Sequence, residues 1–216
     1  MAYLVPHRIE TERLVLRRFE RSDARALATV IQRNLDHLRA YMEWAQFEPQ
    51  SVAQREQWIA EVNRQFDAGE DYTLGMFTRD GALVGGTGYH RRTEPDRLAL
   101  GYWIDRDLEG RGLVTEACAA LTHVAIRIAG TGIVDISHAP SNGRSAAVPA
   151  RLGFQRQQGS GQQCYDRGEK HGSVTWFATA ATLAAEPLAS TPRPRVTDAT
   201  GTEVPWPSPV VPRGSP

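Results

Sequence analysis

The chain has 216 residues, of which 41% are apolar and 23% charged, a composition typical of one folded domain of ordinary size with an additional segment. The 25 Lys and Arg residues balance the 25 Asp and Glu residues, so there is no net positive field to recruit nucleic acid, and we expect no nucleic-acid partner. Two cysteines are too few for a disulfide scaffold, and the N-terminus has no basic region followed by an apolar one. No run approaches the ~18 apolar residues of a membrane-spanning helix. We therefore expect a cytoplasmic protein with no membrane contact.

The N-terminal part predicts one strand and two helices. Residues 13–19 alternate well enough for a strand, and Ser22 then offers a cap for a helix whose apolar positions recur at helical spacing as far as Leu38. Ser51 and Gln54 have the spacing of a capping box, in which each side chain satisfies a free backbone donor of the other residue. A second helix therefore begins here.

The middle of the chain predicts an antiparallel meander. Two apolar runs, 72–78 and 82–90, flank the Asp80-Gly81 pair, which is a strong hairpin signal. A third strand, 98–105, follows with no helix in between. These three strands are therefore expected to be neighbours in one sheet.

The second half alternates helices and strands. A glycine turn leads into a helix at 114–129, a strand at 133–138 and a helix at 145–152. Two short strands at 162–166 and 173–179 complete the pattern. The order of elements predicts an α+β fold, a mixed sheet with helices packed on it.

From about Glu186 onward the composition changes. Prolines recur among serines, threonines and glycines with little periodicity. A segment of this kind buries too little apolar surface to offset the entropy of ordering it. We expect residues 186–216 to be a disordered, Pro-rich tail.

The turn at Gly110-Arg111-Gly112 joins the end of a strand to the start of an apolar helix. The first turn of a helix leaves backbone N–H groups unpaired, and glycines let that backbone approach a phosphate without a Cβ in the way. Arg111 adds a positive charge beside it. The alternative is that the two glycines only supply the positive φ angles of a tight turn.

Two nucleotide-binding motifs are excluded at this turn. A Walker P-loop needs Lys-Ser/Thr after its last glycine, where this chain has Leu113-Val114. A dinucleotide fingerprint needs a third glycine, where this chain has Thr115.

Three segments together carry a more specific signal: the Gly110-Arg111-Gly112 turn with Thr115-Glu116-Ala117 behind it, Gly101-Tyr102-Trp103 in the strand before it, and Asn142-Gly143-Arg144-Ser145 through Arg151-Leu152-Gly153-Phe154. With them the sequence resembles the GNAT acetyltransferase superfamily, in particular its RimJ/RimL-like branch of protein N-terminal acetyltransferases. The likeness covers about residues 8–183, which we take as the domain. It departs from the superfamily at Asp107, where Gln or Arg is usual.

The resemblance implies a mostly antiparallel sheet of about seven strands, helices on both faces, and a splay between the fourth and fifth strands, 98–105 and 133–138. It implies acetyl-CoA as the cofactor, with no metal, and places the pantetheine arm in the splay, paired with backbone groups around Ile104. Asn142 holds the arm, and Ser145 hydrogen-bonds the sulfur. The other residues implied at the cofactor are Gly110, Arg111, Gly112, Leu113, Val114 and Thr115.

The groups that many superfamily members use for acid and base catalysis are missing. The place of the usual tyrosine acid is Pro149, which makes Ser145 the candidate for that role, although it could instead only cap its helix. The place of the usual glutamate base falls in the apolar stretch 98–100. His138, at the end of a strand, and Glu116 are the candidates for the base. The alternatives are that His138 only faces the solvent, and that Glu116 is an acid favoured in the first helical turn by the helix dipole.

The acceptor wall implied by the resemblance contains Trp44, with Tyr89 and His90 across the sheet, although aromatic core packing also explains these residues. Cys118 shares an apolar helical face, so we expect no acetyl-cysteine intermediate but direct attack by a primary amine in a ternary complex. The amine is that of a protein N-terminus or of a small molecule, including an aminoglycoside-type antibiotic. A non-catalytic acyl-CoA-binding sensor is the alternative from another class, and the oligomeric state, a homodimer included, is left open.

Overall fold

The computed structural model describes residues 3–91, 94, 96–158 and 163–207. Within these residues, nine strands form one sheet in the order β11-β1-β2-β3-β4-β5-β6-β10-β7. Neighbouring strands are antiparallel, except that β5 and β6 are parallel. The strands are β1 (Arg8–Glu10), β2 (Leu14–Arg17), β3 (Asp71–Thr78), β4 (Leu83–Arg91), β5 (Arg97–Ile104), β6 (Ile133–His138), β7 (Gln155–Gln157), β10 (Val174–Ala178) and β11 (Arg195–Thr197). The α+β fold and the antiparallel meander are confirmed, with more strands than the seven expected.

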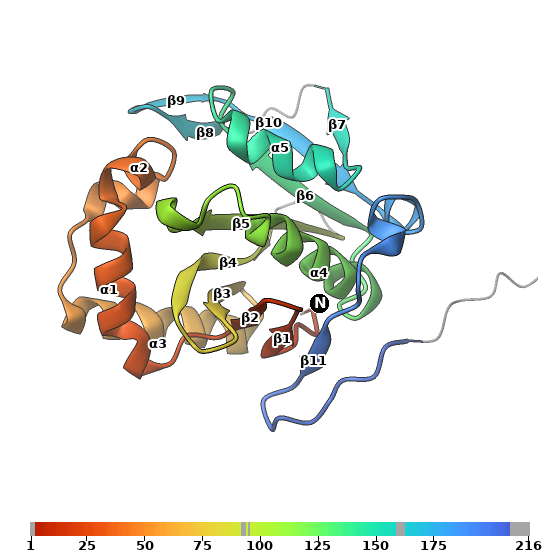
Figure 1. Cartoon of the computed structure of the whole chain (residues 1–216), viewed down its shortest axis with the longest axis horizontal. Helices are drawn as coiled ribbons and strands as arrows, with labels where there is room; N and C mark the ends of the chain where they lie inside the picture. The colour runs from red at the N-terminus through yellow and green to blue at the C-terminus, as the bar shows by residue number, and fades with distance from the viewer. Residues whose placement is uncertain (1–2, 92–93, 95, 159–162, 208–216) are drawn as a thin grey trace, which may run out of the picture.

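Helices cover both faces of this sheet, because alternate strand residues point to opposite sides. Leu14 and Leu16 pack with α4 on one face, whereas Val15 between them packs with α1 and α3 on the other. Figure 1 shows α4 on one side of the sheet and α1 and α3 on the other. The helices are α1 (Ala24–Arg33), α2 (Leu35–Arg39), α3 (Val52–Ala68), α4 (Leu113–Arg127), α5 (Gly143–Arg151) and α6 (Ala180–Leu183), with 3-10 turns η1 (Arg21–Asp23), η2 (Glu43–Phe47), η3 (Arg106–Leu108) and η4 (Leu188–Ser190). Among the described residues, no helix has both the length and the apolarity to cross a membrane.

The predicted helix through Leu38 is divided in two at Asn34. The buried amide of Asn34 donates to the Val30 carbonyl at 2.8 Å and to Asp105 Oδ1 at 3.0 Å, and its oxygen accepts the Arg106 N–H at 2.9 Å. The side chain thus ties the end of α1 to the turn after β5. The predicted cap at Ser22 is also wrong, since Glu20 and Asp23 form the capping box there. The capping box at Ser51 is confirmed.

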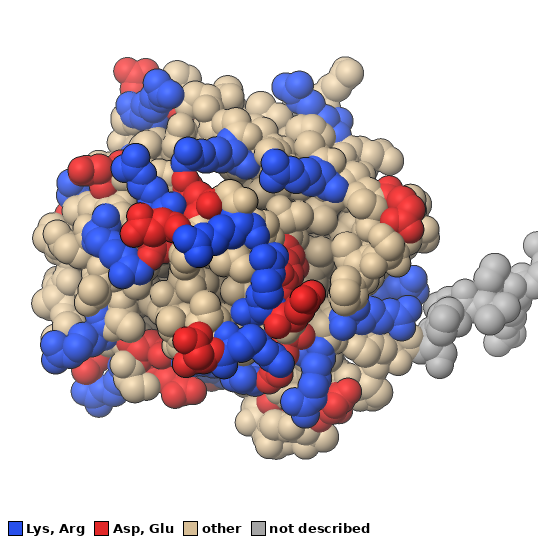
Figure 2. Space-filling view, in the orientation of Figure 1, with Lys and Arg blue, Asp and Glu red and all other residues tan. Residues whose placement is uncertain are grey.

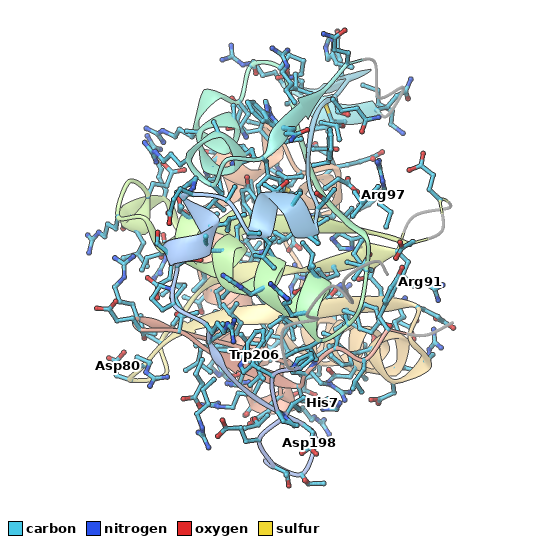
Figure 3. All side chains as sticks on the ribbon, turned by 90° about the vertical axis from the view of Figure 1, so that its right-hand side faces the viewer. His7, Asp80, Arg91, Arg97, Asp198 and Trp206 are labelled. Carbon is cyan, nitrogen blue, oxygen red and sulfur yellow. The ribbon has the colours of Figure 1, made fainter. Side chains whose placement is uncertain are left out.

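The C-terminal segment differs from the expected disordered tail. Residues 195–197 form β11, which pairs with β1 and lines up the buried side chains of Ile9 and Val196. Trp206, labelled in Figure 3, donates from its indole N–H to the Pro194 carbonyl at 3.2 Å and lies edge-on to His123. Within 186–207 the buried residues are Leu188, Pro194, Val196 and Thr197, and residues 208–216 lie outside the described residues.

A second hairpin stands apart from the main sheet. Its strands are β8 (Gln163–Asp166) and β9 (Glu169–Gly172), so the strand expected at 162–166 is not part of the central sheet, and Gln162 lies outside the described residues. The hairpin reaches to the end of α2, where the Arg167 N–H donates to the Ala40 carbonyl at 2.7 Å (Figure 1). Lys170 pairs with Glu43 at 3.1 Å. These contacts connect the two sides of the site described below.

Candidate active site

The site is built on the splay between β5 and β6. The two strands pair only at Arg97↔Ile133, Leu98↔Val134 and Ala99↔Asp135. Beyond these positions β5 continues to Ile104 and β6 to His138 without pairing to each other. The predicted splay is therefore confirmed. Because α4 follows β5 and α5 follows β6, both helices begin at the open end of the gap.

The glycine turn gives α4 an open N-terminus. Gly110 and Gly112 have φ angles of 74° and 75°, a region that favours glycine. Gly112 is the N-cap of α4, and no side chain among the described residues caps that helix. The first-turn N–H groups of α4 are thus available to an anion, as a diphosphate requires.

A cavity of about 440 Å³, here called the turn cavity, lies between this turn, the splay and α5. It brings together eight of the nine residues predicted at the cofactor: Ile104, Gly110, Gly112, Leu113, Val114, Thr115, Asn142 and Ser145. Arg111 is the exception, because its exposed side chain turns back to donate to the Asp107 carbonyl at 3.1 Å. Arg144 and Arg151 line the cavity instead. A capless helix N-terminus with two guanidinium groups fits the diphosphate of a coenzyme A.

The turn also carries a carboxylate that an anionic ligand must approach. Glu109 lies in the lining of the turn cavity, with His37 Nε2 at 2.9 Å from its Oε1 and Arg144 in contact with its Oε2. The Arg144 side chain is 75% exposed, and Figure 2 shows Lys and Arg side chains, with Asp and Glu among them, over the face that carries α5 and the start of α4. Arg144 is therefore free to leave Glu109 and pair with a phosphate.

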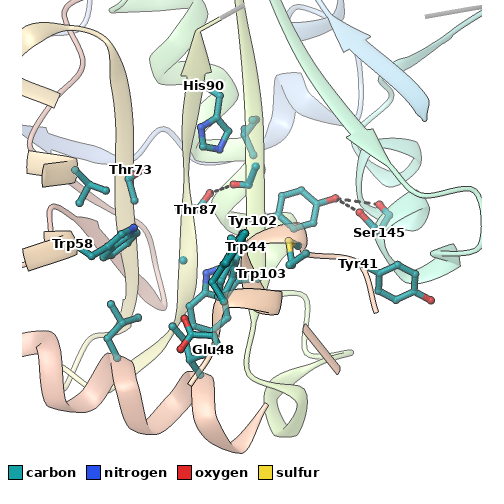
Figure 4. A pocket seen from close by; sticks show the side chains of 18 of the residues that line it. Tyr41, Trp44, Glu48, Trp58, Thr73, Thr87, His90, Tyr102, Trp103 and Ser145 are labelled. Atoms are coloured by element: carbon teal, nitrogen blue, oxygen red, sulfur yellow. Dashed lines mark hydrogen bonds between the residues drawn. The ribbon is translucent and has the colours of Figure 1, made fainter. Parts of the chain in front are cut away.

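Ser145 has a partner that the sequence did not reveal. The Tyr102 hydroxyl lies 3.0 Å from Ser145 Oγ and 3.1 Å from the Ser145 carbonyl oxygen, across the splay (Figure 4). Burial raises the pKa of the Tyr102 phenol well above its usual value, so it stays protonated and available as a hydrogen-bond donor. Asn142 Oδ1 accepts the Ser145 N–H at 3.0 Å, which fixes the serine at the start of α5.

Hydrogen bonds within the protein occupy both candidate bases. His138 lines a cavity but is buried, and both of its ring nitrogens are used: Nδ1 lies 2.8 Å from the Ala139 carbonyl oxygen, and Nε2 accepts the Trp176 indole N–H at 3.1 Å. Since a carbonyl only accepts and an indole N–H only donates, Nδ1 is engaged as a donor and Nε2 as an acceptor, so neither nitrogen is open to the acceptor amine. It is also not the solvent-facing histidine considered above.

Glu116 lies outside both cavities described here. It accepts from Thr11 Oγ1 at 2.6 Å, the Arg13 N–H at 2.9 Å and Arg13 Nε at 2.6 Å. Burial alone raises the pKa of this carboxyl, but the hydrogen bonds from Thr11 and Arg13 outweigh that effect and lower it. Its role is therefore to tie α4 to the β1–β2 turn.

A second cavity of about 630 Å³, here called the aromatic cavity, lies on the α1 and α3 side of the sheet. Trp44 and His90 line it, as predicted, but Tyr89 does not. Tyr89 is fully buried on the opposite face, where its hydroxyl donates to the Leu121 carbonyl at 2.5 Å, because neighbouring strand residues alternate sides. The residues that line both cavities are Tyr41, Met42, Tyr102, Trp103, Asn142 and Ser145.

These features fit an acyltransferase: a gap between two separating strands that can receive a CoA thioester, and a second cavity that meets the first at Tyr102 and Ser145. Residues 13–155 match the acetyltransferase (GNAT) domain, and the chain belongs to this family. Its cofactor is acetyl-CoA, and it is an N-acetyltransferase.

Known proteins support this assignment. YdaF of Bacillus subtilis (strain 168), named as a ribosomal N-acetyltransferase, is 31% identical over 164 residues, which cover 76% of this chain and 89% of YdaF. The [ribosomal protein uS5]-alanine N-acetyltransferase of Escherichia coli (strain K12) is 28% identical over 156 residues, 69% of this chain and 79% of that protein. The fold is also that of RimL, the ribosomal L7/L12 alpha-N-protein acetyltransferase, whose structure has been solved in complex with coenzyme A. The two structures superimpose with a TM-score of 0.68 at 18% identity, over 78% of this chain and 95% of RimL.

Proposed function

We propose that the amine acceptor is the α-amine of a protein or peptide N-terminus, with a small-molecule amine as the alternative, and that the amine attacks acetyl-CoA directly in a ternary complex. One observation carries the direct attack: the two cavities meet at Tyr102 and Ser145. A thioester in the turn cavity therefore lies beside an amine in the aromatic cavity. The relatives named as ribosomal protein acetyltransferases support an N-terminal acceptor.

Ser145 and Tyr102 serve the departing thiolate. The amine nitrogen bonds to the thioester carbonyl carbon, the C–S bond of the tetrahedral intermediate breaks, and the proton that the nitrogen sheds as the amide forms passes to the departing sulfur. The Ser145 hydroxyl donates a hydrogen bond to that sulfur, while the Tyr102 hydroxyl, 3.0 Å from Ser145 Oγ, holds the serine in place. This arrangement supplies the acid that Pro149 does not.

His90 accepts the proton that the acceptor ammonium loses. His90 Nδ1 lies 2.8 Å from Asp71 Oδ2, and because a carboxylate only accepts, this nitrogen carries the proton and Nε2 is the basic one. Gly101 makes room for the ring, since a Cβ there would lie 2.8 Å from Nε2. The ring lines the aromatic cavity.

The test is incubation with acetyl-CoA and a panel of peptides and small amines, with products detected by mass. We expect a mass increase of one acetyl group on an N-terminal amine. Tight acetyl-CoA binding without product across the whole panel would contradict the proposal and favour the non-catalytic sensor. Selective acetylation of aminoglycosides would instead favour the antibiotic-modifying alternative.

A further inference from the structure

The aromatic cavity is larger than the acceptor amine needs. At about 630 Å³ it is in the size range of pockets that enclose a whole small ligand. From Tyr102 and Ser145 it continues across β4 and β5 to Leu27 of α1 and Val62 of α3. A reacting nitrogen occupies only the end beside Ser145, so the remaining volume receives the group that bears the amine.

The walls of the cavity are flat aromatic surfaces. Trp44 and Trp103 stand with ring centroids 6.1 Å apart at 57°, and Trp58 lies farther along the wall (Figure 4). Trp103 lies against the sheet because its cross-strand neighbour is Gly86, where a Cβ would fall 2.5 Å from the indole nitrogen. Aromatic faces of this kind recognise flat apolar groups by stacking and by burial of area.

The charged groups of the cavity neutralise each other. Among the described residues that line it, Glu48 is the acidic one, and its Oε1 is in contact with Arg55 Nη2. Both side chains are 3% exposed, and the Gln50 N–H donates to the other carboxylate oxygen of Glu48 at 2.9 Å. The cavity therefore offers no free carboxylate to a polycation such as an aminoglycoside, and burial of apolar surface dominates recognition.

We propose that the aromatic cavity takes an acceptor whose primary amine is borne on a large, flat apolar group. Two sources share this chemistry: an N-terminal residue with an aromatic side chain, and a free arylalkylamine. The inference rests on the proposed function, because it names the acceptor class of the same site. A small first residue such as alanine or serine leaves most of the cavity unfilled and is a poor acceptor.

The first experiment compares kcat/KM for peptides that differ only in their first residue, Phe, Trp, Leu, Ala or Ser, and for free phenethylamine. Burial of one large apolar side chain predicts a preference of roughly tenfold or more for Phe and Trp over Ala. Turnover of the Phe peptide identifies the peptide source, and turnover of phenethylamine alone identifies the small-molecule source. Equal or better turnover of Ala and Ser peptides overturns the inference while leaving acetyl transfer intact, whereas no product from any amine overturns the proposed function itself.

The second experiment uses Trp44→Ala, with Trp206→Ala as the matched control, since Trp206 lies outside the aromatic cavity. Trp44→Ala should lower kcat/KM about tenfold for the Phe peptide and less than about threefold for the Ala peptide. Trp206→Ala should leave the Phe-to-Ala ratio unchanged. Partial misfolding lowers kcat/KM for both peptides in parallel and does not change the Phe-to-Ala ratio of the molecules that remain active. An unchanged Phe-to-Ala ratio in Trp44→Ala with residual activity therefore counts against the inference.

Discussion

Tyr102→Phe isolates the contribution of one hydroxyl group. The substitution keeps the ring and removes the two contacts to Ser145, at 3.0 Å to Oγ and 3.1 Å to the carbonyl oxygen. The diphosphate end of the turn cavity is not touched. The expected effect is therefore on turnover rather than on the binding of acetyl-CoA.

The magnitude follows from the loss of a hydrogen-bond donor in a partly buried place. Leaving its partner unsatisfied costs about 1–3 kcal/mol, which corresponds to a fall in kcat of roughly 5- to 150-fold. The KM for acetyl-CoA should change less than about twofold, because the proposed role of Tyr102 is realised only when the thiolate departs.

A double-mutant cycle with Ser145→Ala is the assay. If Tyr102 acts through Ser145, the double variant should be no slower than Ser145→Ala alone, because the second substitution removes a partner that is already absent. Wild-type kcat in Tyr102→Phe, or effects of the two substitutions that add, would refute this reasoning.

Three further predictions concern charged groups. Glu109→Gln should tighten acetyl-CoA binding about two- to fivefold in calorimetry, because it removes a carboxylate beside the diphosphate and releases Arg144. Glu116→Gln should lower Tm by roughly 2–6 °C at neutral pH and leave kcat unchanged. Since the folded-state pKa of Glu116 is lowered, its stabilisation is present above the ordinary pKa of 4.5 and is lost as the pH falls through the folded value, so the Tm difference should disappear in acid. His90→Ala should lower kcat/KM about a hundredfold or more, with partial rescue by added imidazole.

Each of these three has a clear contrary outcome. Weaker cofactor binding in Glu109→Gln would mean that the carboxylate supports the turn instead of opposing the diphosphate. A catalytic defect in Glu116→Gln at unchanged Tm would return that residue to the chemistry. Wild-type kcat/KM in His90→Ala would require another base.

The cofactor side of the site was largely predictable because backbone groups build it. Glycines at positive φ angles and a side-chain cap such as Asn142 leave local signals, and they mark a helix N-terminus wherever the rest of the fold lies. The arginine that lies beside the turn cavity could not be predicted in this way. Arg111 is adjacent in sequence but turns outward, whereas Arg144 arrives from α5 only once β5 and β6 are side by side.

Ser145 was predicted, but its Tyr102 partner and the fate of the candidate base His138 could not be, because they depend on long-range contacts. Tyr102 lies in a predicted strand, and the sequence gives no sign that its hydroxyl contacts Ser145, 43 positions away. His138 has the right residue type and place, but the indole of Trp176 on the neighbouring strand occupies its nitrogen. Likewise, β11 was missed because three residues are too few to show a strand period, and its pairing with β1 is non-local.

Calorimetric titration of acetyl-CoA into the wild-type protein and Gly112→Trp tests the central claim most directly. Gly112 has a φ of 75° and caps α4, and a Cβ there would lie 3.5 Å from Arg13 Nη2, so a tryptophan strains the turn that carries the open N–H groups by about 1–2 kcal/mol. Saturable binding to the wild type that is lost in a variant still folded by circular dichroism is the predicted result. No heat with the wild type, or equal affinity in the variant, would contradict a diphosphate held at this turn.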